Sequence, residues 1–369
     1  MKMQPQPLVS VVTPVYNEEK YLSECIESVL AQSYDNWEYT IVNNCSTDRS
    51  LEIALQYAAK DSRIRVHNND RFLEMLPNLN LAIRQISPNS KYCKVVLGDD
   101  WIFPRCLEQM VASAERYPSV GVVSAYEQRG QEIRITGLPS ERTLVSGREA
   151  CSLFLQRKLF LFGSQTSVLY RANLVRNLRP LYDESNLYAD FEACFALLMM
   201  SDLGFVHEIL TFSRPRPTSV GSIAADIGAP HGSMLDILLV YGNECLSPGE
   251  YREAVNLELA DYYRFLGRRL LTDYDPEFWS YHQEVFAKRG LELKRARVAT
   301  TAVKELCKAV LDLRSTVESI RRFLRLRKIR TGQTRSVVLK GGARFSSRQR
   351  RVGAVCETRD IEVRHSGAQ

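Results

Sequence analysis

Short apolar runs alternate with segments of helical periodicity along the first third of this chain, and this alternation limits the folds available to it. The runs that we expect to form strands are Leu8–Thr13, Glu38–Val42, Arg63–His67, Tyr92–Leu97 and Val120–Ser124. The segments that we expect to form helices are Glu18–Ala31, residues 46–60, Glu74–Ile86 and Pro104–Arg116. Strands separated by helices form β-α-β units, whose strands lie parallel. The sequence therefore predicts an α/β fold with a mainly parallel central sheet flanked by helices.

The chain changes character near residue 222. Before that point we expect two more helices and two more strands, at Thr143–Lys158, Ala189–Ser201, Ser164–Tyr170 and Phe205–Phe212. Beyond it we expect helices alone, at Met234–Cys245, Pro248–Leu271, Pro276–Gly290 and Arg295–Arg330. From Thr331 the chain is rich in Arg, Gly and Ser, which is typical of disordered segments. We predict an α/β domain over 1–222, an α-helical C-terminal region over 223–330 and a basic, disordered tail over 331–369.

Charge and cysteine usage exclude several classes of protein. The net charge is +6, but from Thr301 onward 17 Lys and Arg stand against 6 Asp and Glu, so the tail is strongly basic and the body mildly acidic. The nine cysteines are scattered with no C-x-x-C pair, which argues against a disulfide framework and a zinc site. Free cysteines favour a reducing cytoplasm. No run approaches the roughly twenty apolar residues of a membrane span.

Two adjacent carboxylates follow one of the predicted strands. The sequence Gly98-Asp99-Asp100-Trp101 comes directly after the apolar run Val95–Leu97. Neighbouring carboxylates repel each other, and a hard cation between them and a phosphate relieves that repulsion. The pair therefore indicates a site for a divalent metal and a nucleotide diphosphate. The alternative is that the pair caps the next helix or lies in a solvated turn.

Other polar and aromatic residues follow neighbouring predicted strands. Pro14-Val15-Tyr16-Asn17 ends the first strand, and Asn43-Asn44 ends the second. Because the carboxyl ends of parallel strands meet at one edge of a sheet, we expect these residues to share a crevice with Asp99-Asp100. An aromatic ring, amides and carboxylates together suit a nucleoside diphosphate.

The residues around these strand ends also resemble a known family. The run T-P-V-Y-N-E-E-K-Y-L-S-E-C-I-E-S-V-L-A-Q-S-Y-D-N-W-E-Y-T-I-V-N-N-C-S-T-D, from Thr13 to Asp48, is similar to the opening of a family 2 glycosyltransferase with the GT-A fold. The run K-Y-C-K-V-V-L-G-D-D-W-I-F-P, which contains the acidic pair, adds to the resemblance. The resemblance covers Leu8 to about Gly221. It implies that 1–222 is a Rossmann-like catalytic domain that transfers a sugar from a nucleotide-diphospho-sugar.

The resemblance implies roles for five residues in binding the donor. Pro14 and Tyr16 line the nucleobase pocket, and Asn17 beside them belongs to the same nucleotide-sugar site. Asn44 stands where the family usually has an Asp that contacts the base. Asp99 matches the first residue of the acidic motif, which faces the ribose or the metal. Asn offers both an acceptor and donors, so Asn44 either reads the base or is, like Asn43, a turn residue.

The resemblance also implies a metal ligand and a general base. Asp100 matches the second residue of the acidic motif, which binds Mn²⁺ or Mg²⁺. Asp190, in Tyr188-Ala189-Asp190-Phe191, matches the downstream motif that supplies the base, although Ala189 replaces the usual Glu. A metal stabilises the charge that grows on the departing diphosphate, and a carboxylate takes the proton of the acceptor hydroxyl. Attack from the face opposite the leaving group inverts the anomeric configuration.

Four further features have two interpretations each. Asp48 is expected to cap a helix rather than to bind a ligand. Lys94 is expected on a solvated face, with contact to a diphosphate as the alternative. Arg214-Pro215-Arg216 follows the last predicted strand and is a weak candidate for diphosphate contact. The segment Val317–Arg330 is a basic amphipathic helix that either lies on an anionic membrane or packs on the catalytic domain with a solvated basic face.

The sequence therefore predicts a metal-dependent, inverting hexosyltransferase of cell-surface polysaccharide synthesis. Its partners are a nucleotide-diphospho-sugar donor, a glycan or lipid-linked acceptor and an anionic membrane surface; no nucleic acid is expected. We expect it in the cytoplasm, peripheral on the inner face of the plasma membrane. The alternatives are a nucleotidyltransferase and an inactive nucleotide-sugar-binding protein. A nucleotidyltransferase would carry a Gly-rich basic loop where this chain has Tyr16-Asn17-Glu18-Glu19.

Overall fold

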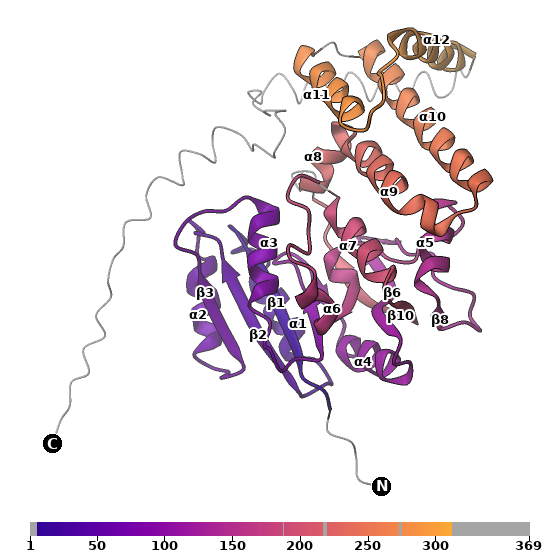
Figure 1. Cartoon of the computed structure of the whole chain (residues 1–369). Helices are drawn as coiled ribbons and strands as arrows, with labels where there is room; N and C mark the ends of the chain where they lie inside the picture. The colour runs from indigo at the N-terminus through magenta and orange to yellow at the C-terminus, as the bar shows by residue number, and fades with distance from the viewer. Residues whose placement is uncertain (1–5, 187, 217–219, 273–274, 312–369) are drawn as a thin grey trace, which may run out of the picture.

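A ten-stranded mixed sheet forms the centre of the molecule (Figure 1). The structure is a computed structural model that describes residues 6–186, 188–216, 220–272 and 275–311. The strands are β1 (Val9–Val15), β2 (Trp37–Asn43), β3 (Ile64–Asn68), β4 (Tyr92–Val95), β5 (Trp101–Ile102), β6 (Val120–Arg129), β7 (Glu132–Ile133), β8 (Leu144–Val145), β9 (Val168–Arg171) and β10 (Asp202–Ser213). The principal order is β3-β2-β1-β4-β9-β6-β10-β5, with β7 beside β6 and β8 beside β10.

The longer strands run in one direction, as the alternation of strands and helices predicts. β1 pairs in parallel with β2 and β4, β2 with β3, and β6 with β10. The short strand β9 lies antiparallel between β4 and β6 and joins the two parallel groups. The β-branched residues of β1 and β2 are buried on both faces of the sheet, which explains their nearly continuous apolar sequence.

Helices cover both faces of the sheet. In the first 200 residues these are α1 (Leu22–Leu30), α2 (Ser50–Ala58), α3 (Met75–Arg84), α4 (Cys106–Arg116), α5 (Gly147–Leu155), α6 (Ala172–Asn177) and α7 (Ala189–Leu198). One buried apolar cluster joins α1, α2 and α4 to the sheet, and another joins α3, α5, α6 and α7 to its other face. The sheet is therefore a buried layer, and polar residues reach solvent only at its edges.

The carboxyl-terminal part of the described chain is helical, as expected. It consists of α8 (Val220–Asp226), α9 (Ala229–Cys245), α10 (Pro248–Thr272), α11 (Pro276–Ala287) and α12 (Arg295–Leu311), which lie together at one end of the molecule (Figure 1). Helix α9 packs on α5 and α7, so the helical part continues the core on that face. Arg157, which follows α5, forms ion pairs with Glu258 and Asp261 of α10. None of the described helices combines the length and apolarity needed to cross a membrane.

The short elements depart most from the sequence prediction. The sequence prediction missed β5, β7, β8, α6 and α8, each of seven residues or fewer. β1 also continues past Pro14, which was expected to end it. The ladder between β1 and β4 ends at Val12, so the missing N–H of Pro14 interrupts no strand pairing on that side. The short strands among them are stabilised by their neighbours in the sheet, and the periodicity of their own sequence does not reveal them.

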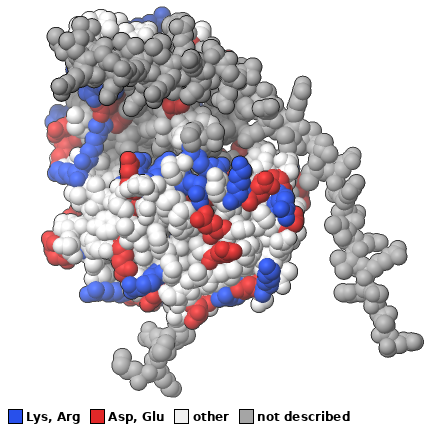
Figure 2. All heavy atoms as spheres, turned by 180° about the vertical axis from the view of Figure 1, so that it is seen from behind, with Lys and Arg blue, Asp and Glu red and all other residues white. Residues whose placement is uncertain are grey.

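Charged side chains are interspersed over the described surface. Figure 2 shows Lys and Arg next to Asp and Glu on the face seen from behind, without one sign covering it. Most of the excess of Lys and Arg over Asp and Glu counted from Thr301 onward belongs to residues after Leu311. The segments Val317–Arg330 and 331–369, on which we based the membrane and disorder predictions, lie outside the described residues.

The first residue of α5 permits a close approach to α7, the helix that carries Asp190. A Cβ at Gly147 would lie 1.8 Å from the carbonyl oxygen of Leu198. We expect Gly147→Ala to lower the free energy of unfolding by about 3 kcal/mol, because the backbone must shift to accept the methyl group. Urea denaturation measures this loss. The matched control is Gly249→Ala in the first turn of α10, where nothing lies within 4 Å of the added Cβ. Equal stability of the two variants would contradict this account of the packing.

Candidate active site at the carboxyl edge of the sheet

Most strands of the sheet contribute to one of its edges. The parallel strands β1, β2, β3, β4, β6 and β10 end there, and the antiparallel strand β9 begins there. Polar loops follow each of these ends because the backbone leaves the ladder and its groups need new partners. This edge holds Tyr16, Asn44, Asp99 and Arg214, which are far apart in the sequence. We call it the acidic rim, after Glu18, Asp99, Asp100 and Glu127.

The loops after β1 and β2 are joined by hydrogen bonds. Asn17 adopts a left-handed backbone with φ of 56°, which Asn tolerates better than most residues. Its Oδ1 accepts a hydrogen bond of 2.8 Å from the N–H of Thr47. Asp48 accepts hydrogen bonds from the N–H groups of Ser50, at the start of α2, and Glu19. The expected capping role of Asp48 is confirmed, and it also links the two loops.

An aromatic pair lies beside these loops. The ring of Tyr16 packs edge-on against Phe72, with 4.9 Å between the ring centroids. Both rings belong to loops at the same edge, after β1 and after β3. Tyr16 remains partly exposed, as does Pro14 two residues earlier. An exposed ring face supported by a second ring is suited to stacking on a planar base.

The side chain of Asn44 is fully engaged within the protein. Its Oδ1 accepts hydrogen bonds from Asn69 Nδ2 and from the N–H of Leu73, each of 2.9 Å, and its Nδ2 donates to the carbonyl of Leu73. The residue is 2% exposed. Asn43 is also buried, and its Nδ2 donates to Asn68. Of the two interpretations of this pair, the geometry favours the structural one, since Asn44 fixes the loop 69–73 that carries Phe72.

The acidic pair lies against the loop after β1. A Cβ at Gly98 would lie 3.3 Å from Cγ of Glu18 and 3.5 Å from the carbonyl oxygen of Pro14, so the missing side chain allows these loops to touch. The N–H of Asn44 donates to the carbonyl of Val15 and joins the end of β2 to the same place. The structure therefore brings the ends of β1, β2 and β4 together, as the sequence predicts.

Asp100 is buried and held from two sides. Its Oδ2 accepts a hydrogen bond of 2.6 Å from Thr166 Oγ1, and its Oδ1 accepts one of 3.0 Å from the N–H of Arg214. Burial, followed by the charge of Asp99, raises the pKa of the Asp100 carboxyl to about 8, and these two hydrogen bonds act in the opposite direction. The carboxyl group is thus prearranged, but its charged form lacks a neutralising partner.

Asp99 and Glu18 are bridged by an arginine. Nη1 of Arg216 lies 2.6 Å from Oε2 of Glu18 and 3.0 Å from Oδ2 of Asp99. Arg214 pairs with Glu24 and lies over the ring of Tyr21, with its Cζ 4.2 Å from the ring centroid. The segment Arg214-Pro215-Arg216 therefore contacts Glu18, Asp99 and Asp100 of the rim directly, while its contact with a diphosphate stays a prediction.

Lys94 occupies a position that the sequence analysis did not predict. It is fully buried in β4, and its Nζ donates to the carbonyl oxygens of Thr166 at 2.5 Å and Val168 at 3.1 Å. Both earlier interpretations, a solvated face and contact with a diphosphate, are wrong. Burial lowers the pKa of Lys94, while nearby acids including Glu127 and Asp100 act in the opposite direction. Lys94 is an internal support for the segment that holds Asp100.

Two other polar residues of the site were missed by the sequence analysis. Thr166 Oγ1 accepts from the N–H of Leu97 while it donates to Asp100. Glu127, in β6, is 4% exposed and accepts hydrogen bonds from Ser164 and Ser213. The strand predicted to end at Ser124 continues to Arg129 and includes Glu127. A Glu this close to the predicted end of a buried strand could have indicated a polar residue of the site. The role of Thr166 has no such signal.

Asp190 lies in the first turn of α7 and is partly buried. Its Oδ1 accepts a hydrogen bond from the N–H of Phe191. Burial raises the pKa of Asp190 to about 7, with a small contribution from the charge of Glu127. A carboxyl group that titrates near neutral pH is suited to taking a proton.

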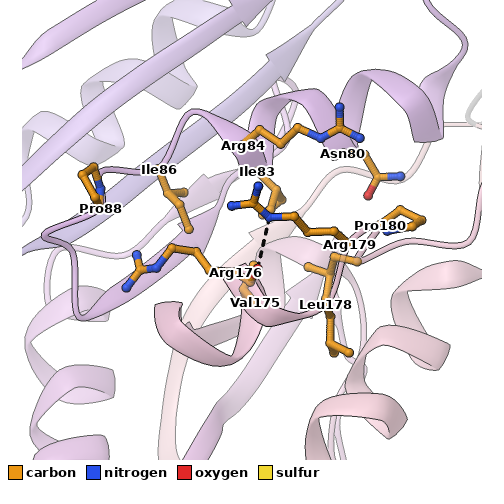
Figure 3. A pocket seen from close by; sticks show the side chains of 11 residues that line it. Asn80, Ile83, Arg84, Ile86, Pro88, Val175, Arg176, Leu178, Arg179 and Pro180 are labelled. Atoms are coloured by element: carbon orange, nitrogen blue, oxygen red, sulfur yellow. Dashed lines mark hydrogen bonds between the residues drawn. The ribbon is translucent and has the colours of Figure 1, made fainter.

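A cavity of about 240 Å³ lies away from the rim, between α3 and α6 (Figure 3). Arg176, in its wall, donates to the carbonyl oxygens of Ser87 and Ser90, which precede β4. The cavity is therefore at the edge where β4 begins, opposite to Asp99 and Asp100. It is lined mainly by apolar and arginine side chains and has no carboxylate in its wall. The chemistry expected of a donor site is found at the rim instead.

The rim residues fit a divalent cation that shares its ligands with a diphosphate. Within the described ranges no three His, Cys, Asp or Glu side chains gather around one point. Mg²⁺ commonly binds through one or two carboxylates plus substrate phosphates, which Asp99 and Asp100 satisfy. The raised pKa of Asp100 and the guanidinium of Arg216 between Asp99 and Glu18 both show that positive charge is favoured here.

Comparison with protein families identifies the domain that holds this site. Residues 10–179 match the family model described as glycosyl transferase family 2. This part of the chain, which is less than half of it, is similar to that family. The Bacillus subtilis (strain 168) protein EpsE, described provisionally as a glycosyltransferase, is 37% identical over 153 residues, which are 39% of this chain and 54% of EpsE. EpsJ of the same organism, named an uncharacterised glycosyltransferase, is 29% identical over 50% of this chain and 54% of EpsJ. The chain thus spans about half the length of these two relatives.

Solved structures show the same fold. Residues 1–349 of TarS from S. aureus, in complex with UDP-GlcNAc, match with a TM-score of 0.56 and 18% identity over 76% of this chain and 80% of that one. The mannosyltransferase PcManGT from Pyrobaculum calidifontis, in complex with GDP-Man and Mn²⁺, matches with a TM-score of 0.50 and 15% identity over 82% and 87%. The family 2 domain of this chain therefore has the GT-A fold, as the resemblance implied.

The hydroxyl group of Thr166 is expected to contribute to stability as well as to the site. Thr166→Val leaves the N–H of Leu97 and a carboxylate oxygen of Asp100 without this partner. We expect the free energy of unfolding to fall by about 2 kcal/mol in urea denaturation, because both groups are buried. Thr300→Val on the exposed side of α12 is the control, with an expected change below about 1 kcal/mol. A Thr166→Val variant as stable as the control would show that these hydrogen bonds contribute little.

Proposed function

We propose that this protein is a metal-dependent, inverting hexosyltransferase that moves a sugar from a nucleotide-diphospho-sugar to an acceptor hydroxyl. The observation that carries the proposal is the meeting of three strand ends at the acidic rim of a family 2 domain, with Tyr16 and the pair Asp99-Asp100 at that edge. The named ligands of two proteins with the same fold, UDP-GlcNAc and GDP-Man, support a donor of this class.

The rim residues bind and orient the donor in this proposal. The ring of Tyr16, backed by Phe72, stacks on the base, and Pro14 and Asn17 complete that side of the pocket. Asn44 acts indirectly, by holding the loop of Phe72 through Leu73. When Mn²⁺ or Mg²⁺ is bound through Asp99 and Asp100, it supplies Lewis-acid stabilisation of the charge on the departing diphosphate.

Asp190 is the proposed general base. Its carboxylate accepts the proton of the acceptor hydroxyl while that oxygen attacks the anomeric carbon from the side opposite the diphosphate, so the configuration inverts. The N–H of Phe191 holds one carboxylate oxygen in place and leaves the other for the acceptor. Burial raises the pKa of Asp190 to about 7, which is close to neutral pH. Its carboxylate is therefore a stronger base than that of an exposed Asp.

The acceptor and the cellular place are proposed from the relatives and the tail. EpsE and EpsJ are named as glycosyltransferases, and we propose that this chain is one that builds a cell-surface polysaccharide on a glycan or lipid-linked acceptor. A cytoplasmic protein that reaches the inner face of the plasma membrane through its basic carboxyl-terminal residues suits that acceptor.

Asp190→Asn is expected to separate catalysis from donor binding. The amide cannot accept the acceptor proton, so kcat should fall about 1,000-fold while the donor dissociation constant, measured by calorimetry, changes little. A variant with undiminished kcat would exclude Asp190 as the base.

The pH dependence of the wild-type rate follows from the same residue. The base works only when deprotonated, and the pKa of Asp190 is raised to about 7. We therefore expect kcat to rise about tenfold per pH unit below neutrality and to level off above it. Initial rates at saturating donor and acceptor measure this profile. A rate that is independent of pH from about 5 to 8 would contradict the assignment.

Donor binding is expected to need both the metal and the acidic pair. A UDP-sugar or GDP-sugar should raise the melting temperature in the presence of Mn²⁺ and much less in EDTA, since a ligand stabilises only the state it binds. Asp99→Asn should abolish the metal-dependent part of this shift. Asp35→Asn, on an exposed residue that precedes β2 at the other edge, should retain it. An identical shift in both variants would place the metal elsewhere.

A further inference from the structure

Glu127 is a buried carboxylate whose hydrogen-bond partners are both hydroxyl groups. It is 4% exposed, near the end of β6. Its Oε1 accepts a hydrogen bond of 2.5 Å from Ser213 Oγ, and its Oε2 accepts one of 3.1 Å from Ser164 Oγ. Burial of a carboxylate costs free energy that two neutral hydroxyl groups offset only in part. Such a residue is costly for the fold, which suggests that its charge or its placement serves the site.

The two serines belong to the segments that hold Asp100. Ser213 directly precedes Arg214, whose N–H donates to Asp100 Oδ1. Ser164 lies two residues before Thr166, whose hydroxyl donates to Asp100 Oδ2. Glu127 therefore connects the end of β10 to the segment before β9, and these same two segments grip Asp100 from opposite sides. Separation of the segments would release both hydrogen bonds to Asp100.

Glu127 also lies within electrostatic range of the proposed base, because its strand β6 packs against α7, the helix that carries Asp190. Several ionisable groups among the described residues interact electrostatically with Asp190. They are Glu127 from β6, Tyr182 from the preceding loop, and Tyr188 and Cys194 from the segment of Asp190 itself. Of these, Glu127 is the carboxylate, and its negative charge disfavours the charged form of Asp190. The same residue thus contacts the support of Asp100 and influences Asp190.

We propose that Glu127 is a positioning residue for sugar transfer, which ties together the two segments that hold Asp100 and places a fixed negative charge near Asp190. This rests on the proposed function, because it takes Asp190 as the base. Glu127 does not touch the reacting atoms. Through Ser164 and Ser213 it fixes the position of Asp100. Through its charge it raises the basicity of Asp190.

Two substitutions at Glu127 separate its placement from its charge. In Glu127→Gln the amide oxygen can accept from one serine and the amide N–H can donate to the other, so the connection is kept and the charge is lost. Glu127→Ala loses both. We expect kcat to fall at least about tenfold in Glu127→Ala, with little change in KM for the donor, and most of this loss to be recovered in Glu127→Gln at its optimal pH.

The pH profile distinguishes this role from a purely structural one. Without the charge of Glu127 the acidic limb of kcat should move to lower pH in Glu127→Gln and Glu127→Ala. The control Glu253→Gln removes an equal charge from the exposed surface of α10 and should leave both kcat and the limb unchanged. If only Glu127→Ala loses activity and the limb stays in place in Glu127→Gln, the electrostatic role is wrong.

A measurement without substrate keeps the test independent of activity. Carboxyl ¹³C NMR titration of Asp190, with its signal assigned by its absence in Asp190→Asn, should give a lower apparent pKa in Glu127→Gln than in the wild-type chain. An unchanged pKa overturns the electrostatic role of Glu127 whether or not the chain transfers sugar, and undiminished kcat in Glu127→Ala overturns its positioning role. A wild-type chain that transfers no sugar overturns the proposed function instead, so the two failures can be told apart.

Discussion

The hydrogen bonds from Lys94 to the carbonyl oxygens of Thr166 and Val168 are the interaction on which the site depends. They fix the start of β9, the antiparallel strand that joins the two parallel groups of the sheet. Thr166 then donates to Asp100 and accepts from Leu97. A buried ammonium group is costly, so it is retained where several acceptors surround it. Here those acceptors belong to the segment that must be rigid if Asp100 is to keep its position.

Charge balance at the rim follows from this rigid support. Asp99 and Glu18 share Arg216, whereas the hydrogen-bond donors to Asp100 among the described residues are the neutral Thr166 hydroxyl and the N–H of Arg214. Arg214 and Arg216 belong to the segment after β10. The segment that donates a hydrogen bond to Asp100 therefore also places a guanidinium group next to Asp99 and Glu18. A bound cation and diphosphate would bring both signs of charge to the same place. The rim therefore holds ion-paired acidic residues around one hydrogen-bonded, buried carboxyl group.

The sequence predicted the helices of several turns and the strands that are buried along their full length. The longer strands and helices of the sheet were expected within a few residues of their bounds, and the convergence of the ends of β1, β2 and β4 followed from the parallel arrangement. The capping role of Asp48 also followed, because a cap is a local interaction along the chain. Short elements such as β5 escaped because their stability comes from neighbouring strands.

Residues whose partners are distant in sequence could not be interpreted in the same way. Lys94 reaches Thr166 across 72 residues, and Glu127 reaches Ser213 across 86. A sequence shows that such a side chain is polar, but the neighbours that satisfy it are decided by the packing of the sheet. For Lys94 the expectation of solvent was wrong because two carbonyl oxygens, of Thr166 just before β9 and of Val168 in β9, accept hydrogen bonds from its Nζ. The buried polar residues, which carry the most information about the site, are therefore the ones that require the three-dimensional structure.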